Sequence, residues 1–449
     1  MKMQRKKIQR LLSFFTVVIL FITAFTSCYF IPTQPTETTL PQNGSDSTAP
    51  TDSTTPPATT ENPTGTPGAP FVGTSVYAKA TYPKNAQGAV SFVVDDGYRD
   101  TATIISDRLL PKYDKLRISY ALMANSLAEL DSDYGIDGLE YYIKDQNGSY
   151  NYFFTNQSNL NFWKHQYADN GNYCEFLSHS YSHSMFGNDD NGGEQQVQTS
   201  NGLTTLITAK GTISAEVQGS QQIIHDLLNQ ESNYYVMPGT GQANSSYYLN
   251  MLESGAYYRG ARTTNKVLNV KENIKAPFSY IDSWMVTPSE EASQWTQFID
   301  NAVADGDWAC FCIHNILEDS NPSPWGHYTL ESKADELFGH ADQLADEGKL
   351  WIGTMSEVAD YLQYWNASTI TALHNQETNI IRVSVTPDET VADYDVTLTV
   401  KVAVPQSWKS NSIKNASGTT LKTVEENGRL YVLVLVPAGT PYVDILPKW

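Results

Sequence analysis

The hydrophobic and polar positions between residues 72 and 366 alternate between short apolar runs and amphipathic stretches. This alternation indicates strands followed by helices. The apolar runs predict strands at residues 89–94, 234–237, 257–262, 308–314 and 350–353. Apolar residues at helical spacing predict helices over 212–230, 331–347 and 355–365. The order of elements predicts an α/β fold, arranged as a parallel (β/α) barrel or an incomplete, distorted one.

The pattern changes after residue 366, where apolar and polar residues alternate with a period of two. The clearest such segments are 380–385, 394–404 and 429–436, separated by Pro, Gly, Asn and Ser. This alternation is typical of antiparallel strands. We therefore expect a catalytic domain over residues 73–366 and a small β-sandwich as an accessory domain over residues 367–449.

The N-terminus carries basic residues followed by the apolar run 14–22 and then by Thr26, Ser27 and Cys28. This order predicts a secretory signal over residues 1–27. Small residues before Cys28 resemble a bacterial lipobox, in which the cysteine is acylated and anchors the chain to the membrane. The alternative is an uncleaved membrane anchor, for which the apolar run is slightly short. Both interpretations predict an extracytoplasmic, cell-surface protein.

Residues 28–72 are predicted to form a disordered stalk. The segment consists almost entirely of Thr, Pro, Ser, Gly, Asn and Gln, and residues 32–70 include no aromatic residue. Proline keeps such a segment extended, so it would hold the folded part away from the membrane.

Charge and cysteine content exclude some functions. The full chain has 29 basic and 49 acidic residues, and the signal holds five of the basic ones, so the mature chain carries 24 − 49 = −25. Such a charge argues against nucleic acid as a partner. The remaining cysteines, Cys174, Cys310 and Cys312, are an odd set without regular spacing and predict no disulfide framework. We expect Cys310 and Cys312 to be buried on the same side of one strand.

Three polar motifs follow predicted strands. Asp95 and Asp96 stand at the carboxyl end of the run 89–94, where barrels of this kind keep their active sites. Adjacent carboxylates there point in different directions, so one can bind a metal while the other faces the substrate as a base. On its own, Asp-Asp-Gly is more often a surface turn.

The second and third motifs supply histidines. His179 and His183 are four residues apart, a spacing that directs two imidazoles at one metal ion. Together with one carboxylate they would leave coordination positions open for water and substrate. His314 ends the run 308–314. Because all three motifs end predicted strands of one barrel, we expect them to meet at the same rim.

These motifs resemble those of the polysaccharide deacetylases, the family 4 carbohydrate esterases, over most of residues 85–365. The segment Ser91-Phe-Val-Val-Asp95-Asp96-Gly97-Tyr98 resembles the family's Thr-Phe-Asp-Asp-Gly motif, and His179-Ser-Tyr-Ser-His183 resembles its His-Ser/Thr-x-x-His motif. Asp282-Ser283-Trp284 resembles its fourth motif. The resemblance implies the family's distorted (β/α) barrel and a metal-dependent deacetylase.

The resemblance also implies individual roles. Asp95 would be the catalytic base, and His314 the general acid oriented by Asp282. The implied ligands of a divalent metal, Zn²⁺ with Co²⁺ as the alternative, are Asp96, His179 and His183. Substrate-binding residues would be Tyr98, Trp284 and Pro238.

The third motif departs from the family pattern, because the loop after residue 234 contains Pro238 and Gly239 but no arginine. In the family this arginine accompanies the base. Arg262 or Arg259 on the following predicted strand would supply the missing cation, and we favour Arg262.

The function expected is hydrolysis of acetyl groups from a polysaccharide, releasing acetate. The substrate would be an N-acetylated polymer such as chitin or peptidoglycan, or O-acetylated xylan. The alternatives are an inactive carbohydrate-binding lipoprotein on the same scaffold, and a structural envelope lipoprotein whose sandwich docks a partner. Aromatic residues between 134 and 173 are interpreted equally well as a glycan platform or as packing.

Overall fold

The computed structural model describes residues 71–124, 127, 142–144, 150–152, 156–169, 173–180, 195–199, 202–206, 215–238, 250, 252–321, 327–409 and 412–448. The signal, Cys28 and nearly all of the predicted stalk lie outside this part. Among the described residues, no helix has the length and apolarity that crossing a bilayer requires.

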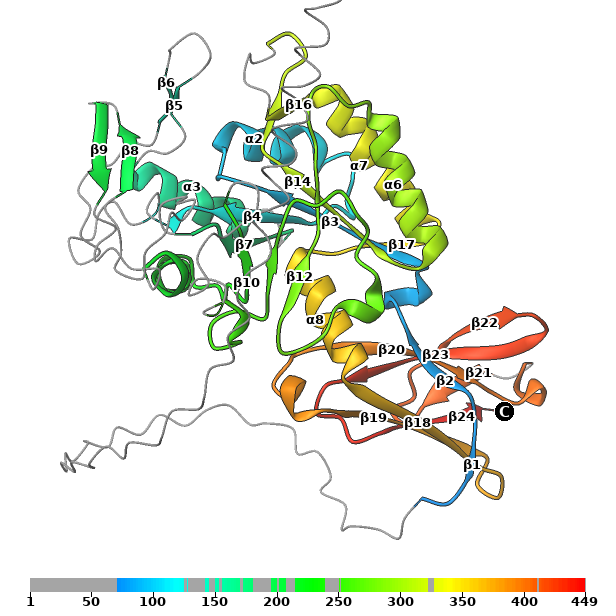
Figure 1. Ribbon diagram of the computed structural model, residues 1–449. Coiled ribbons are helices and arrows are strands. Elements are labelled where there is room, and N and C mark those ends of the chain that lie inside the picture. The colour runs from blue at the N-terminus through cyan, green and yellow to red at the C-terminus, as the bar shows by residue number, and fades with distance from the viewer. Residues whose placement is uncertain are drawn as a thin grey trace, which may run out of the picture. The chain divides into compact units, whose positions relative to one another are not determined.

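A nine-stranded, entirely parallel sheet forms the centre of the fold (Figure 1). Its strands follow the order β12-β11-β10-β7-β4-β3-β14-β13, with β17 pairing with β3 as well. The strand bounds are β3 Gly88–Val94, β4 Ile118–Leu122, β7 Cys174–Ser178, β10 Tyr234–Val236, β11 Gly260–Arg262, β12 Ser279–Ile281, β13 Trp284–Met285, β14 Trp308–Ile313 and β17 Leu350–Ile352.

The sheet is strongly curled. Its two end strands, β12 and β13, are separated in the chain by Asp282 and Ser283 alone, so both edges of the sheet lie close together. The fold is therefore a distorted, incompletely closed (β/α) barrel, which confirms the predicted fold class.

Helices cover the outside of the barrel, with α6 and α7 side by side on one flank (Figure 1). The helices are α2 Arg99–Ile104, α3 Asn156–Asp169, α4 Ser220–Leu228, α6 Ala292–Asp305, α7 Glu331–Asp346 and α8 Met355–Asn366. α8 begins with a capping box, in which Thr354 and Glu357 bond to each other's backbone N–H groups. The predicted helix 212–230 is divided into a π-helical turn, Ala215–Gly219, and α4.

Alternating side chains of β3 face two different cores. Val90, Phe92 and Val94 pack outward against the helices, whereas Ala89 and Val93 belong to the cluster inside the barrel. β14 alternates in the same way, so Cys310 and Cys312 both point inward, as expected for residues two apart on a strand. Both cysteines are buried and, like Cys174, free of disulfides. The alternation of β3 continues for one more residue, so the side chain of Asp95 points toward the interior.

The C-terminal part is an antiparallel β-sandwich, as predicted. One sheet has the order β1-β18-β19-β24-β21 and the other β2-β20-β23-β22. The bounds are β1 Thr74–Ser75, β2 Ala78–Thr81, β18 Ser368–Asn375, β19 Ile380–Pro387, β20 Thr397–Ala403, β21 Ser412–Asn415, β22 Lys422–Glu426, β23 Arg429–Pro437 and β24 Val443–Lys448. Strands β1 and β2 precede the barrel in the chain, yet each completes one of the two sandwich sheets.

Three two-stranded pairs lie outside the barrel sheet and the two sandwich sheets. They are β5 Tyr142–Lys144 with β6 Tyr150–Tyr152, β8 Gln195–Thr199 with β9 Gly202–Leu206, and β15 Asn315–Leu317 with β16 Tyr328–Leu330. The aromatic residues between 134 and 173, interpreted from the sequence as a glycan platform or as packing, lie only partly within the described residues. Trp163 is buried in the outer core, and Phe162 and Tyr167 pack against that core, so these three residues serve packing.

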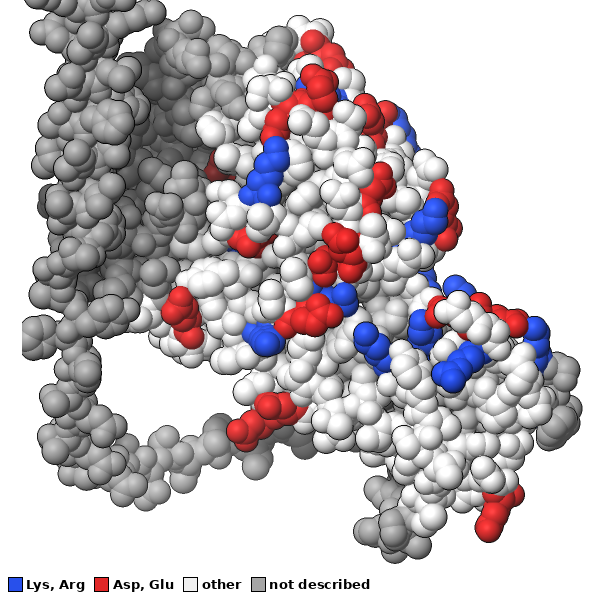
Figure 2. Space-filling model, turned by 45° about the vertical axis from the view of Figure 1, so that its right-hand side comes forward, with Lys and Arg blue, Asp and Glu red and all other residues white. Residues whose placement is uncertain are grey.

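Acidic and basic side chains lie next to one another on the face shown in Figure 2. The ion pairs at the protein surface include Arg108 with Glu331, at 2.7 Å. Pairs of this kind contribute little to stability, because water screens the charges and two long side chains lose conformational freedom when they pair.

Candidate active site

The two adjacent carboxylates sit at the carboxyl end of β3. The N–H of Asp95 donates to the carbonyl of Ile313 at 2.8 Å, which extends the pairing of β3 with β14 by one residue. Asp96 then adopts a φ of 68°, in the left-handed region that residues with a side chain rarely occupy. This change of backbone direction separates the two side chains. Both carboxylates are buried, at 2% and 4% exposed.

Arg262 provides the positive charge beside Asp95. It ends β11 and is fully buried, and its Nη2 lies 2.6 Å from Asp95 Oδ2. Its Nη1 donates to Ser283 Oγ at 3.3 Å, and Ser283 Oγ donates in turn to the Thr263 carbonyl at 2.6 Å. Burial opposes the charge on Arg262, but Asp95, Cys312 and Cys310 together outweigh burial and raise the pKa of the guanidinium. The other candidate cation, Arg259, binds Asp360 at 2.9 Å instead.

His179 faces Asp96 from the loop that follows β7. Its Nδ1 is 2.8 Å from the Val236 carbonyl, and its Nε2 is 3.1 Å from Asp96 Oδ1. The next residue, Ser180, has a φ of 66°, so left-handed backbone occurs in both loops of the site. Burial favours the neutral imidazole, but Asp95 and Asp96 outweigh burial and raise the pKa of His179.

His314 and Cys312 approach the same carboxylates from β14 and its end. His314 Nε2 is 3.9 Å from Asp96 Oδ2, and its side chain is 14% exposed. Cys312 Sγ is 3.4 Å from Asp95 Oδ2 and 3.8 Å from His314 Nδ1. Burial raises the pKa of the Cys312 thiol well above its usual value, with Arg262 acting in the opposite direction. The thiol is therefore neutral near pH 7.

Two groups of these residues suit a metal ion. Asp95, Cys312 and His314 have ligand atoms within 4.8 Å of one another. Asp96 and His179 form the other group. When the Nδ1–H of His179 donates to the Val236 carbonyl, the Nε2 lone pair points at Asp96 Oδ1, and two electron-rich atoms face each other at 3.1 Å. A proton on Nε2 or a metal ion between the two atoms removes this repulsion, and a backbone hydrogen bond on the other ring nitrogen is the usual arrangement for a metal-binding histidine. The residues present therefore fit a divalent ion.

The group of Asp95, Cys312 and His314 fits a metal ion less well than the group of Asp96 and His179. Arg262 already places a fixed positive charge 2.6 Å from Asp95, and Cys312 would have to lose its proton in a buried environment that favours the thiol. We therefore favour Asp96 and His179 as ligands. The third ligand predicted from sequence, His183, lies outside the described residues.

Asp282 and Trp284 lie at the gap in the barrel. Within the described part of the chain, Asp282 Oδ1 accepts hydrogen bonds from Thr263 Oγ1 and Asn265 Nδ2, both at 2.8 Å, and not from His314. The Trp284 indole donates to Glu290 at 2.9 Å. The roles inferred for these two residues from the family motif stay predictions.

Tyr98 and Pro238 are both buried. Tyr98 lies close to Asp96, and Pro238 lies just beyond the end of β10. Tyr98 precedes α2, and burial, reinforced by the charge of Asp96, raises the pKa of its hydroxyl well above the usual value. Pro238 follows β10, whose last residue, Val236, accepts the bond from His179. Their contact with substrate stays a prediction.

Sequence reasoning missed Cys312 and Ser283 as members of this site. The spacing of Cys310 and Cys312 predicted that both are buried on the same side of one strand, but spacing alone does not show which charged group lies opposite Cys312. Ser283 lies in the motif Asp282-Ser283-Trp284, in which the resemblance gave roles to Asp282 and Trp284 alone.

The site is thus an acidic and histidine centre at the carboxyl end of a parallel barrel. No protein-family model and no curated protein matches the chain. The solved structures that resemble it include members of carbohydrate esterase family 4. A family 4 acetyl xylan esterase from Clostridium thermocellum, in complex with a cobalt ion, shares 15% identity over 60% of this chain and 89% of its own, with a TM-score of 0.33.

A domain described as Xyl-CE4, from a multidomain xylanase of the Trinervitermes trinervoides hindgut metagenome, shares 13% identity over the same fractions, also with a TM-score of 0.33. A family 4 pseudoenzyme from Bacillus anthracis shares 13% identity over 63% of this chain and 68% of its own, with a TM-score of 0.32. Similarity at this level supports no conclusion about the activity, substrate or metal of this protein.

Proposed function

We propose that this protein is a divalent-metal-dependent deacetylase that hydrolyses acetyl groups of a polysaccharide. One observation carries the proposal: two adjacent buried carboxylates have different nearest partners. Asp95 is paired with Arg262 at 2.6 Å and is 3.9 Å from His179 Nε2, whereas Asp96 is 3.1 Å from His179 Nε2 and 3.9 Å from His314 Nε2. This division separates a proton-accepting carboxylate from a ligand carboxylate, as hydrolysis assisted by a metal requires.

When bound at Asp96 and His179, with His183 as the predicted third ligand, a divalent ion supplies a Lewis acid for the acetyl carbonyl and for a water molecule. Asp95 accepts the proton of the attacking water at its carboxylate. Arg262 holds that carboxylate in place and compensates its charge. His314, which is partly exposed at the rim, donates a proton to the departing amine or alcohol. The products are acetate and a deacetylated sugar.

The substrate is proposed only as a class, because N-acetyl and O-acetyl groups undergo the same chemistry. The test measures acetate release from acetylated xylan, N-acetylated chitooligosaccharides and peptidoglycan, each with added Zn²⁺ or Co²⁺. We expect activity on at least one substrate, and a loss of about 10²-fold or more in Asp95→Asn with the bound metal retained. Asp96→Asn should lose metal as well as activity.

The exposed His225, which pairs with Asp226 outside the site, supplies the control His225→Asn, with metal content and activity unchanged. Metal content is measured by mass spectrometry after reconstitution. A wild-type protein that stays metal-free under excess Zn²⁺ would overturn the proposal. Metal binding without acetate release on every substrate would favour the inactive carbohydrate-binding alternative.

The lipid anchor on Cys28 and the extracytoplasmic location form part of the same proposal, supported by the order of basic, apolar and small residues before Cys28. Metabolic labelling with a fatty acid tests the anchor, and Cys28→Ala should abolish the label.

A further inference from the structure

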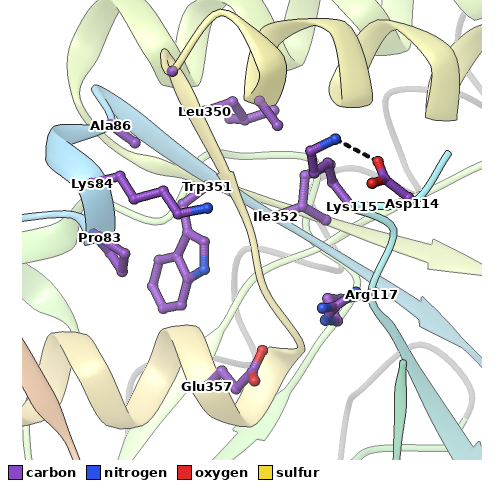
Figure 3. A pocket seen from close by; sticks show the side chains of 12 residues that line it. Pro83, Lys84, Ala86, Asp114, Lys115, Arg117, Leu350, Trp351, Ile352 and Glu357 are labelled. Carbon is purple, nitrogen blue, oxygen red and sulfur yellow. Dashed lines mark hydrogen bonds and ion pairs between the residues drawn. The ribbon is translucent and has the colours of Figure 1, made fainter. Parts of the chain in front are cut away.

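A cavity of about 300 Å³ lies at the end of the barrel opposite Asp95 (Figure 3). One wall comes from β17, which pairs with the first residues of β3, and another from Arg117, which directly precedes β4. Asp95 follows the last residue of β3, seven residues further on, so the cavity is about 20 Å from the catalytic carboxylates. It does not belong to the site described above.

Three basic side chains line this cavity, and two of them lack an acidic partner. Among the described residues, Lys84 and Arg117 form no ion pair, and the side chain of Arg117 donates only to the Leu116 carbonyl, at 2.9 Å. Lys115, in contrast, is paired with Asp114 and with Asp346. Figure 3 shows Lys84 on one side of the cavity and Lys115 and Arg117 on the other.

The two acidic side chains of the lining each interact with another group of the protein. Asp114 pairs with Lys115, and Glu357 accepts the backbone N–H of Thr354 at 2.8 Å as part of the cap of α8. The lining itself holds three cations and two carboxylates, 3 − 2 = +1, and Asp346, the second ion-pair partner of Lys115, brings the local charge to zero. A neutral neighbourhood still contrasts with the whole chain, which carries −20.

Trp351 adds a flat apolar surface to the same lining. Its ring packs against Tyr82 and Tyr361, with ring centroids 6.3 and 5.2 Å away, and the residue stays partly exposed in the cavity. These neighbours keep the indole in one orientation. A rigid aromatic face with charged groups beside it suits a ligand that has an apolar face and polar edges.

We propose that this cavity binds a uronic acid residue of a glycan. The C–H face of the sugar ring packs on Trp351, and its carboxylate lies between Arg117 and Lys84. The hydroxyl groups of the sugar donate to the remaining carboxylate oxygens of Asp114 and Glu357. Lys84 and Arg117 are the two lining cations that form no ion pair among the described residues, so a single carboxylate suits them, whereas a doubly charged phosphate would be repelled more strongly by the two acidic side chains.

This site would hold an acidic glycan chain at one end of the barrel, independently of any hydrolysis at the other end. No residue of the cavity lining belongs to the proposed active site. The cavity proposal and the deacetylase proposal can therefore fail separately.

The test is isothermal titration calorimetry of the full chain with a glucuronic acid-containing oligosaccharide, a neutral oligosaccharide of equal length, and inorganic phosphate. We expect one acidic oligosaccharide to bind per chain, with an affinity that falls as salt is added. Arg117→Gln and Lys84→Gln should each weaken binding about tenfold or more. Lys349→Gln is the matched control, because Lys349 lies between two lining residues and does not line the cavity itself.

Thermal melts confirm that each variant folds, and Lys84 is exposed, so its variant tests the site without disturbing the core. Acetate release from a soluble neutral substrate should be the same in Arg117→Gln as in the wild type. The proposal is overturned if the acidic oligosaccharide does not bind, if the neutral oligosaccharide or phosphate binds equally well, or if both pocket variants bind like the wild type.

Discussion

At the scale of single residues, the site depends on how buried charges are paired. Asp95 and Arg262 are both almost fully buried, and each compensates the other at 2.6 Å. A buried charge that loses its partner is strongly destabilising, because neither water nor another group replaces the lost interaction. Breaking the pair by removing one partner therefore destabilises the fold, and the intact pair holds the proposed base in position.

Replacing Arg262 with Met should lower the free energy of unfolding by about 3–5 kcal/mol, since Asp95 would remain as an unpaired buried carboxylate. The double variant Arg262→Met with Asp95→Asn should recover much of this loss, because both charges are then absent. Urea denaturation of the wild type, both single variants and the double variant measures the coupling. Additive losses in the double variant would show that the pair is not coupled.

Glu175 gives the protein a pH-dependent stability. Burial raises the pKa of this carboxyl to about 7, although Ser119 Oγ, at 2.7 Å, and the Ser356 N–H, at 3.0 Å, lower it in part. Between pH 4.5 and about 7 the folded chain holds a proton here that the unfolded chain releases. Stability from this group therefore falls as pH rises through that window, by at most about 1.4 kcal/mol per pH unit.

Glu175→Gln should flatten this part of the stability profile, since glutamine does not titrate. Thermal melts from pH 4.5 to pH 8 compare the variant with the wild type, and Glu377→Gln, at an exposed loop position, is the control. An identical slope in wild type and Glu175→Gln would contradict the assignment.

At the scale of elements, short strands bring the groups of the candidate site together. β11 has three residues, and its last residue is Arg262. It starts at Gly260, where an added Cβ would lie 2.5 Å from the Ser279 carbonyl oxygen and 3.0 Å from the ring of Tyr234. The strand can pair closely with β10 and β12 only because this position has no side chain.

Gly260→Ala should lower the free energy of unfolding by about 1–3 kcal/mol, since the backbone of β11 or β12 must move to make room. The same movement should displace Arg262 from Asp95 and reduce acetate release. Gly418→Ala is the control, because Gly418 has a φ of 86° in open space in the sandwich. We expect the control to lose stability through backbone strain and to keep full activity. Normal activity in folded Gly260→Ala would contradict this account.

At the scale of the whole molecule, the sandwich is joined to the barrel through α8. Arg259 of the barrel binds Asp360 of α8 at 2.9 Å, and its guanidinium lies 3.8 Å from the ring centre of Tyr394 in the sandwich. Tyr394 donates to Gln363 of α8 at 2.6 Å. Tyr361 and Tyr364 of the same helix are buried in the core of the sandwich.

Removing residues 367–449 should therefore yield a chain that is insoluble or unfolds without cooperativity, because the tyrosines of α8 lose their cover and β1 and β2 lose their partners. Solubility and calorimetry of residues 71–366 are compared with those of residues 71–449. A soluble fragment 71–366 with a sharp transition and wild-type acetate release would contradict this prediction.

Much of this architecture was predictable from local pattern. The apolar run 89–94 becomes β3, and the helical periodicity over 331–347 and 355–365 becomes α7 and α8. Strand β4 was not predicted, because its run of five residues is short, uniformly buried and shows no alternation of apolar and polar positions. The participation of β1 and β2 in the sandwich was not predictable, since sheet partners about 300 residues away leave no signal in a segment's own sequence.

The sequence by itself determined the strand-and-helix order, the sandwich and the residues Asp95, Asp96, His179 and His314 as candidates, because side-chain type and spacing are local properties. Only the tertiary structure decided that Arg262 and not Arg259 lies against Asp95, that Cys312 joins that pair, and that Asp282 bonds to Thr263 and Asn265. Such choices depend on which strands become neighbours in the curled sheet. Closure of the barrel sets these neighbours, and it is a property of the whole chain.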